Sequence, residues 1–262
     1  MKPPIYHRMF GYNLGLLPNP QLAVLEHGVT TIDQARQKSG ATIGYPGWGL
    51  IYQLLLSHLD RSREEIIIET GTNWGCTTIV LAQTLIDSGC QGRVHTFELD
   101  PDNAARANAN LQAAGVADRV ELHLGDSRQT LPNALEGLSA IRIAFLDASH
   151  LYNDVKQEFD TVLPKLSDDA LVIFDNTYRI ADAGEDQRVN GFLRDMPGLL
   201  SSAGLAACKT RLATNYCRSC FFWLKSLSVP WWIAEHLKKS TLAIRHNYRL
   251  LPLKSCILPL VT

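Results

Sequence analysis

Residues 66–77 read Ile-Ile-Ile-Glu-Thr-Gly-Thr-Asn-Trp-Gly-Cys-Thr, and this stretch decides the fold. Its β-branched run predicts a buried parallel strand at 65–69 that ends in the acid Glu69. Gly71 and Gly75 follow, and a helical pattern begins behind them. A strand that turns through glycines into a helix brings backbone N–H groups close to a ligand, because no Cβ blocks the approach. Since Glu69 would repel a pyrophosphate and attract a cationic amino group, the stretch favours a charged amino-acid nucleoside over a dinucleotide.

A second strand, predicted at 93–98, also ends in an acid, Glu98. It lies roughly 20–30 residues beyond the glycine turn, where nucleotide-binding α/β folds place the carboxylate that accepts hydrogen bonds from ribose hydroxyls. A third strand, predicted at 119–124, leads into Asp126 and Ser127. Polar residues at successive strand ends indicate one ligand site along the edge of a sheet.

Strands and helices alternate along the chain, which predicts a parallel sheet with helices on both faces. We expect helices at 49–59, 75–87, 102–114, 128–136, 151–163 and 185–202. We expect strands at 65–69, 93–98, 119–124, 141–146, 170–174, 205–213 and 216–225. The prediction is therefore an α/β protein with a Rossmann-like, doubly wound sheet of about seven strands.

These motifs resemble those of the class I S-adenosylmethionine-dependent methyltransferases. The matching stretches are Glu69-Thr70-Gly71-Thr72-Asn73-Trp74-Gly75, Phe97-Glu98-Leu99-Asp100-Pro101, Ala114-Gly115-Val116-Ala117-Asp118-Arg119-Val120 and Gly125-Asp126-Ser127. The resemblance covers about residues 44–225 and implies that the sheet is mostly parallel with its last strand antiparallel. Asn73 stands where the family usually has a glycine, a departure shared with the metal-dependent O-methyltransferase branch.

The resemblance implies that S-adenosylmethionine is the cofactor. The residues it assigns to cofactor binding are Glu69, Gly71, Thr72, Asn73, Gly75, Thr77, Glu98, Asp126, Ser127 and Asp147. The glycine turn forms the pocket for the methionine end, and Thr77 contacts the cofactor carboxylate. Glu98 holds the ribose, and Asp126 and Ser127 lie beside the adenine.

Acids also end the fourth and fifth predicted strands, as Asp147 and the pair Asp175-Asn176. Two carboxylates and an amide oxygen at neighbouring strand ends form an all-oxygen site of the kind that Mg²⁺ takes. Catechol-type O-methyltransferases bind their metal at these positions, so the resemblance implies that Asp147, Asp175 and Asn176 are metal ligands. The alternative is that Asp147 caps the next helix and Asp175-Asn176 shapes a turn.

His150 stands three residues after Asp147, where the catechol-type enzymes have a lysine that takes the hydroxyl proton. An imidazole with a pKa of about 6.5 accepts a proton at neutral pH, and a metal ion acidifies a hydroxyl. We therefore expect His150 to be the general base, with Asp147 beside it. The alternative is an ordinary, partly buried histidine at a helix start. The histidines at positions 7, 27, 58, 95 and 123 have no comparable context and are interpreted as structural or surface groups.

The expected function is metal-assisted O-methylation of a hydroxyl on a small molecule such as a phenol, a sugar or a natural-product diol. An NAD-dependent oxidoreductase would share the strand, glycine turn and helix, but Gly71 and Gly75 do not spell GxGxxG. A methyltransferase-like binding protein without turnover is the second alternative. It would not need the complete set of Asp147, His150, Asp175 and Asn176.

Length and charge limit the remaining possibilities. A chain of 262 residues fits one α/β domain with appendages, and a net charge of −1 argues against nucleic-acid binding. No stretch of about 18 apolar residues and no secretory signal is visible, so we expect a cytoplasmic protein without a transmembrane segment.

Three regions are expected along the chain. Residues 1–60 form an N-terminal helical and lid segment, in which Tyr45 or Trp48 borders the acceptor unless Trp48 is a core residue. Residues 61–226 form the methyltransferase domain. The basic extension 227–262 packs on the domain, forms a homodimer or touches a membrane surface, the last being the least favoured.

Overall fold

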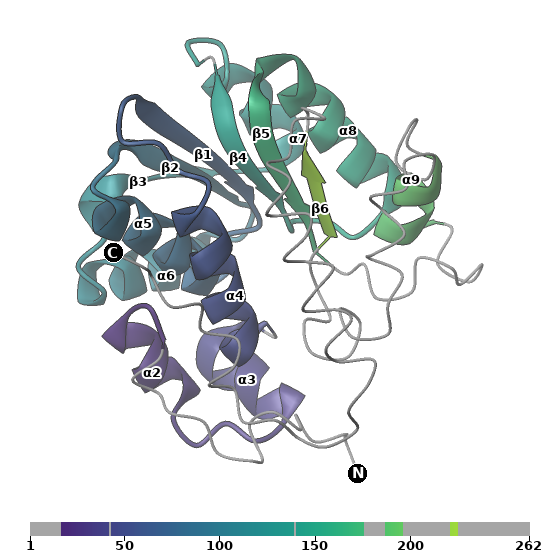
Figure 1. Cartoon of the computed structure of the whole chain (residues 1–262). Coiled ribbons are helices and arrows are strands. Elements are labelled where there is room, and N and C mark those ends of the chain that lie inside the picture. The colour runs from purple at the N-terminus through teal and green to yellow at the C-terminus, as the bar shows by residue number, and fades with distance from the viewer. Residues whose placement is uncertain (1–16, 42, 139, 176–186, 196–220, 225–262) are drawn as a thin grey trace, which may run out of the picture.

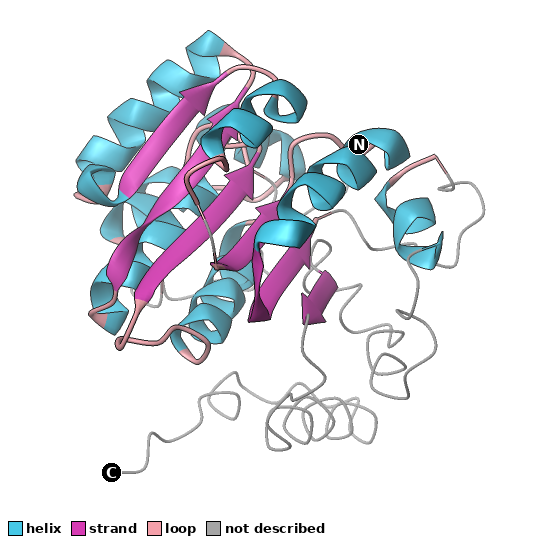
Figure 2. Ribbon diagram, turned by 90° about the horizontal axis from the view of Figure 1, so that it is seen from above, coloured by secondary structure: helices cyan, strands magenta, loops and turns pink. Residues whose placement is uncertain are grey.

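The computed structural model describes residues 17–41, 43–138, 140–175, 187–195 and 221–224. Within these ranges a single sheet lies between two layers of helices (Figures 1 and 2). The strands are β1 Glu64–Thr70, β2 Gln91–Glu98, β3 Val120–Leu124, β4 Ile141–Leu146, β5 Leu166–Phe174 and β6 Phe221–Leu224. Their order across the sheet is β3-β2-β1-β4-β5-β6. Since the order reverses between β1 and β4, a ligand crevice is expected at the carboxyl ends of these two strands.

Strands β1 to β5 all run parallel, whereas β6 pairs antiparallel with β5. The five parallel strands confirm the prediction of an α/β, Rossmann-like sheet. The expected strand at 205–213 and the extension at 227–262 lie outside the described residues, so the total of about seven strands stays a prediction.

The helices cover both faces of the sheet (Figure 1). They are α2 Pro20–Glu26, α3 Ile32–Ser39, α4 Gly44–Leu56, α5 Cys76–Ser88, α6 Pro101–Ala113, α7 Ser127–Ala134, α8 Tyr152–Val162 and α9 Val189–Asp195. Among the described residues, 3₁₀ turns occur at Ala117–Arg119 and Leu163–Lys165. None of the helices in the described ranges combines the length and the apolar character that a membrane span requires.

The core consists of two layers because successive strand residues point to opposite faces. In β1, Ile67 packs with the α4–α5 side of the core, whereas Ile68 packs with the α7–α8 side. Both isoleucines are completely buried. A strand that is apolar on both faces is typical of the centre of a parallel sheet.

The prediction that the first long helix starts at residue 49 is wrong, because α4 begins at Gly44. The Gly/Pro-rich segment 44–49 suggested a loop, but a proline is tolerated in the first helical turn, where its missing N–H would have no partner. Trp48 is completely buried in the core beside α5. It is therefore a core residue and not a wall of the acceptor site.

Candidate active site

A cavity of about 740 Å³ lies where the strands β1, β2, β4 and β5 end. Its lining comes from the glycine turn, from the residues after β2, β3 and β4, and from the segment around α3. The volume is in the range of pockets that enclose a small molecule. The cavity therefore occupies the crevice that the strand order predicts.

Gly71 lets the ends of β1 and β4 approach each other closely. Its φ is +84°, and a Cβ at this position would lie 2.4 Å from the carbonyl oxygen of Asp147. The backbone N–H groups of Gly71 and Thr72 both donate to the carbonyl oxygen of Phe97, at 3.0 and 3.1 Å. The turn is thereby fixed to β2 on one side and pressed against the end of β4 on the other.

Asn73 continues this turn with a φ of +49°. Asparagine tolerates the left-handed region better than most residues, which explains how it replaces a glycine here. Its side-chain Nδ2 donates to the carbonyl oxygen of Gly40 at 2.8 Å and ties the turn to the end of α3.

Glu98 is held in place by two backbone donors. The N–H of Asn73 donates to Oε2 at 2.6 Å, and the N–H of Asp100 donates to Oε1 at 2.9 Å. The residue is buried but lines the cavity. Because each carboxylate oxygen can accept a second hydrogen bond, Glu98 can still receive two external donors such as neighbouring hydroxyls.

Helix α5 starts at the cavity without a side-chain cap. Cys76 and Thr77, in its first turn, both line the cavity. The first N–H groups of a helix have no intrahelical acceptor and carry a partial positive charge. This end of the cavity therefore suits a carboxylate.

Glu69 does not line the cavity, although the sequence pattern placed it there. Its Oε2 accepts hydrogen bonds from the hydroxyls of Thr78 and Thr96, and burial raises the pKa of its carboxyl to about 7. The hydroxyls of Thr72 and Thr96 share a hydrogen bond across 2.5 Å, in which either can donate. Thr72 does line the cavity, so Glu69 reaches it only through two hydroxyls.

Asp147, His150 and Asp175 form the opposite side of the cavity. Each offers a ligand atom within 4.8 Å of the others, and Nε2 of His150 lies 3.2 Å from Oδ1 of Asp147. Burial raises the pKa of Asp147 to about 7, while a hydrogen bond with Asp175 opposes this rise. Two carboxyl groups in contact need a proton or a cation between them. This set of donors therefore fits a divalent cation.

His150 is partly exposed at the same place. Burial lowers the pKa of its imidazole, with Asp175 opposing and Arg188 reinforcing this shift. The ring is neutral at pH 7 and able to accept a proton. Asn176, the third predicted metal ligand, lies outside the described residues.

Asp126 and Ser127 line the cavity where α7 begins. Asp126 caps α7 by accepting from the N–H of Arg128 at 3.0 Å and also forms an ion pair with its guanidinium. That guanidinium bonds Asp154 as well, at 2.8 Å. The charge of Asp126 is therefore compensated by the protein itself.

Glu158 is a cavity residue that the sequence analysis missed. It is 1% exposed, and it accepts hydrogen bonds from the hydroxyls of Thr70 and Ser127. Burial raises the pKa of its carboxyl to about 7. The available signal was its position on α8, where it shares the buried face with Val155 and Phe159. Two cationic lining residues, Arg36 and Arg188, were also missed.

The cavity brings together most of the predicted site residues. Those that line it are Gly71, Thr72, Asn73, Thr77, Glu98, Asp126, Ser127, Asp147, His150 and Asp175. Gly75, like Glu69, does not line it and instead lies against Ala107 of α6.

Known proteins resemble this chain in sequence over the same region. Residues 68–177 match a family model described as "Methyltransferase domain". The chain is 35% identical over 146 residues to a catechol O-methyltransferase of Mycobacterium tuberculosis, which covers 52% of this chain and 63% of that protein. It is 31% identical over 135 residues to a catechol O-methyltransferase of Niastella koreensis, covering 51% and 58% of the two chains. The chain thus spans about six-tenths of the length of these relatives.

Solved structures show the same likeness. A cofactor-bound protein from MTB, Rv0187, is 28% identical with a TM-score of 0.53, over 69% of this chain and 80% of that one. An O-methyltransferase from Bacillus cereus in complex with SAH is 25% identical with a TM-score of 0.52, over 67% and 76% of the two chains.

Proposed function

Because this chain carries a class I S-adenosylmethionine-dependent methyltransferase domain that resembles the catechol-type branch, we propose that it methylates a hydroxyl group of a small molecule. One observation carries the proposal. Glu98, Asp147, His150 and Asp175 come from three separate segments of the chain and line a single cavity of about 740 Å³. A hydroxyl-binding acid, a base and a pair of acids that fits a cation are the groups that such a reaction requires.

The cofactor would occupy the side of the cavity formed by the ends of β1 and β2. Thr77 and the first turn of α5 would receive its carboxylate, and Glu98 would accept the hydrogen bonds of the ribose hydroxyls. Asp126 and Ser127 would border the adenine. When bound, S-adenosylmethionine supplies a methyl group made electrophilic by the sulfonium.

Asp147, Asp175 and Asn176 would hold a divalent cation, of which Mg²⁺ suits the oxygen ligands best. A cation at this position lowers the pKa of a hydroxyl bound next to it. The contact between Asp147 and Asp175 supports this assignment, because a cation would relieve the repulsion of the two charges.

His150 would take the proton from the acceptor hydroxyl. Its imidazole is partly exposed beside Asp147, and burial lowers its pKa, which keeps it neutral at pH 7. Asp147 would then orient the ring and stabilise the protonated imidazole. The remaining work of the protein is to align the acceptor oxygen with the methyl group.

The acceptor is proposed to be a small hydroxylated molecule. The two curated relatives named above are catechol O-methyltransferases, so a catechol is the first compound to test, followed by other phenols, sugars and natural-product diols. We further propose that the complete sheet has about seven strands with its last strand antiparallel, and that the methyltransferase domain spans 61–226.

The test is methyl transfer from labelled S-adenosylmethionine to a panel of catechols, phenols and sugar diols, with Mg²⁺ and with a chelator. We expect a product that depends on Mg²⁺, together with calorimetric binding of S-adenosylmethionine and no binding of NAD. Binding of NAD alone would overturn the proposal and favour the NAD-dependent oxidoreductase. Tight cofactor binding without any product over the whole panel would favour a binding protein.

A further inference from the structure

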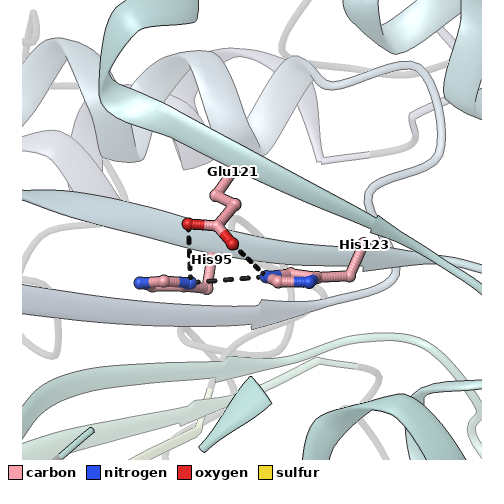
Figure 3. A group of neighbouring side chains, drawn as sticks. All are labelled: His95, Glu121 and His123. Atoms are coloured by element: carbon pink, nitrogen blue, oxygen red, sulfur yellow. Dashed lines mark hydrogen bonds and ion pairs between the residues drawn. The ribbon is translucent and has the colours of Figure 1, made fainter. Parts of the chain in front are cut away.

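A second group of metal-ligating side chains lies on β2 and β3, and none of its members lines the cavity. His95 is the register partner of Glu121, and His123 follows Glu121 by two residues on the same strand. Residues with this relation point to the same face of a sheet. Figure 3 shows the three side chains turned toward one another.

The distances between the ligand atoms of this His95–Glu121–His123 cluster fit three side chains that bind one metal ion. Nδ1 of His95 and Nε2 of His123 form a hydrogen bond at 3.3 Å, and a metal ion bound to both nitrogens would displace its proton. Oε2 of Glu121 lies 3.7 Å from Nδ1 of His95, and Oε1 of Glu121 lies 3.6 Å from Nε2 of His123. The contacts of the carboxylate are too long for hydrogen bonds. Ligands at about 2.0–2.1 Å from a tetrahedral zinc ion lie about 3.4 Å from each other, which is close to all three distances.

Packing holds the two imidazoles in this arrangement. The ring of His123 stacks on Phe97, with centroids 4.6 Å apart, and lies edge to edge with the nearly coplanar ring of His95, with centroids 5.6 Å apart. His95 is 8% exposed, whereas half of the Glu121 side chain is exposed. The cluster is thus rigid on the histidine side and open to solvent on the carboxylate side, where water can complete the coordination.

The ligand types distinguish this cluster from the acids of the cavity. Imidazole nitrogens suit Zn²⁺ and related first-row ions, whereas Mg²⁺ prefers oxygen ligands only. We propose that His95, Glu121 and His123 bind one Zn²⁺ ion, which fastens the edge strand β3 to β2. The ion would also fix the ring of His123 against Phe97. The carbonyl oxygen of Phe97 accepts the hydrogen bonds from the glycine turn. This inference does not depend on the proposed methyl transfer.

The test uses the full chain without a histidine tag, stripped of metal and kept in excess Mg²⁺. An Asp175→Ala background removes one ligand of the other group, Asp147–His150–Asp175, and so weakens metal binding there. Folding is checked by circular dichroism. Titration with ZnCl₂ in a calorimeter should give one site with a Kd of about 10 μM or tighter. A melting curve should rise in temperature on addition of Zn²⁺.

Three substitutions in this background decide the assignment. His123→Ala should weaken Zn²⁺ binding by at least about a hundredfold, and Glu121→Ala by about tenfold. Glu121 is solvent-exposed, so its replacement leaves the core intact. The control is His27→Ala, an exposed histidine at the end of α2, which should bind Zn²⁺ as the background does. The proposal is wrong if the background binds no Zn²⁺ below about 100 μM, or if His123→Ala binds it equally well.

Discussion

The acidic side chains at the strand ends have different partners on the two sides of the cavity, where Glu98, Asp147 and Asp175 line it and Glu69 lies behind the first side. At the ends of β1 and β2, donors of the protein itself surround the acids: two hydroxyls bond Glu69, and two backbone N–H groups bond Glu98. At the ends of β4 and β5, Asp147 and Asp175 contact each other and His150.

This difference indicates what each side binds. An acid that already accepts hydrogen bonds from the protein is fixed in orientation and can receive further neutral donors, such as hydroxyl groups. Acids that meet one another carry negative charge that only a proton or a cation can offset. In the proposed function the first side would therefore be preformed for a nucleoside, whereas the second side would be completed by a cation.

Removing an acid from the second side should have the largest effect. Asp175→Ala should lower metal-stimulated turnover by at least about 10³-fold, or about 4 kcal/mol in the barrier, while the affinity for S-adenosylmethionine changes little. Steady-state rates with and without Mg²⁺, and calorimetry with the cofactor, measure the two quantities. Asp118→Ala, at an exposed acid before β3, is the control and should behave like the wild type. Full activity of Asp175→Ala in chelator would remove the distinction between the two sides.

The close approach of the ends of β1 and β4, which joins the two sides of the cavity, can be tested at Gly71. Gly71→Ala should lower the free energy of unfolding by about 3 kcal/mol or more, because the new Cβ would lie 2.4 Å from the carbonyl oxygen of Asp147 at a positive φ. Gly49→Ala is the matched control, since no atom lies within 4 Å of its added Cβ. In helix α4 this control should stabilise the protein by about 0.5–1 kcal/mol. Urea unfolding measures both, and equal stabilities would show that the close approach is not required.

The pH dependence of stability should reveal the buried acid of the first side. The pKa of Glu69 is about 7 in the folded protein and 4.5 in its ordinary state, because burial disfavours the charged form. The folded protein thus holds this proton more tightly, so the stability it contributes is complete below pH 4.5 and is lost as the pH rises through 7. Between pH 5 and pH 8 this titration should lower the free energy of unfolding by an amount on the order of 2–3 kcal/mol, and Glu69→Gln should abolish this decrease.

Urea unfolding of the cofactor-free and metal-free protein at these two pH values measures this loss. Asp147 and Glu158 also have a pKa raised by burial to about 7, so part of the pH dependence should remain in Glu69→Gln. Glu64→Gln, at the exposed start of the same strand, should leave the wild-type profile unchanged. An unchanged profile in Glu69→Gln would mean that Glu69 is charged at neutral pH in the fold.

The positions of the site acids along the strands could be predicted from the sequence. β-branched runs and glycine turns fix where a strand ends, and the carboxyl ends of parallel strands meet at one edge, so Glu98, Asp147 and Asp175 were expected to lie there. The direction of a side chain at a strand end was not predictable. The side chain of Glu69 points behind the cavity because the hydroxyls of Thr78 and Thr96 donate hydrogen bonds to its carboxylate there.

Contacts between distant segments also escaped prediction. Glu158 lies on a helix, and its place beneath the cavity depends on how α8 packs against β1 and α7. The approach of His95 to His123 depends on the register of β2 and β3, which no local pattern contains. Helix α4 started earlier than expected because its proline falls within the first turn.

The smallest effect should come from the acid that is already bonded by the protein. Glu98→Gln keeps the shape of the side chain but removes its charge, and its NH₂ group replaces one of the two oxygens that accept a backbone N–H. The affinity for S-adenosylmethionine should fall about tenfold, or about 1.4 kcal/mol, with little change in metal stimulation at saturating cofactor. Calorimetry with the cofactor gives the first quantity, and Glu136→Gln at an exposed position is the control. If Glu98→Gln instead abolished metal stimulation at saturating cofactor, the two sides of the cavity would act as one unit, and the division between a preformed nucleoside site and an ion-completed site would fail.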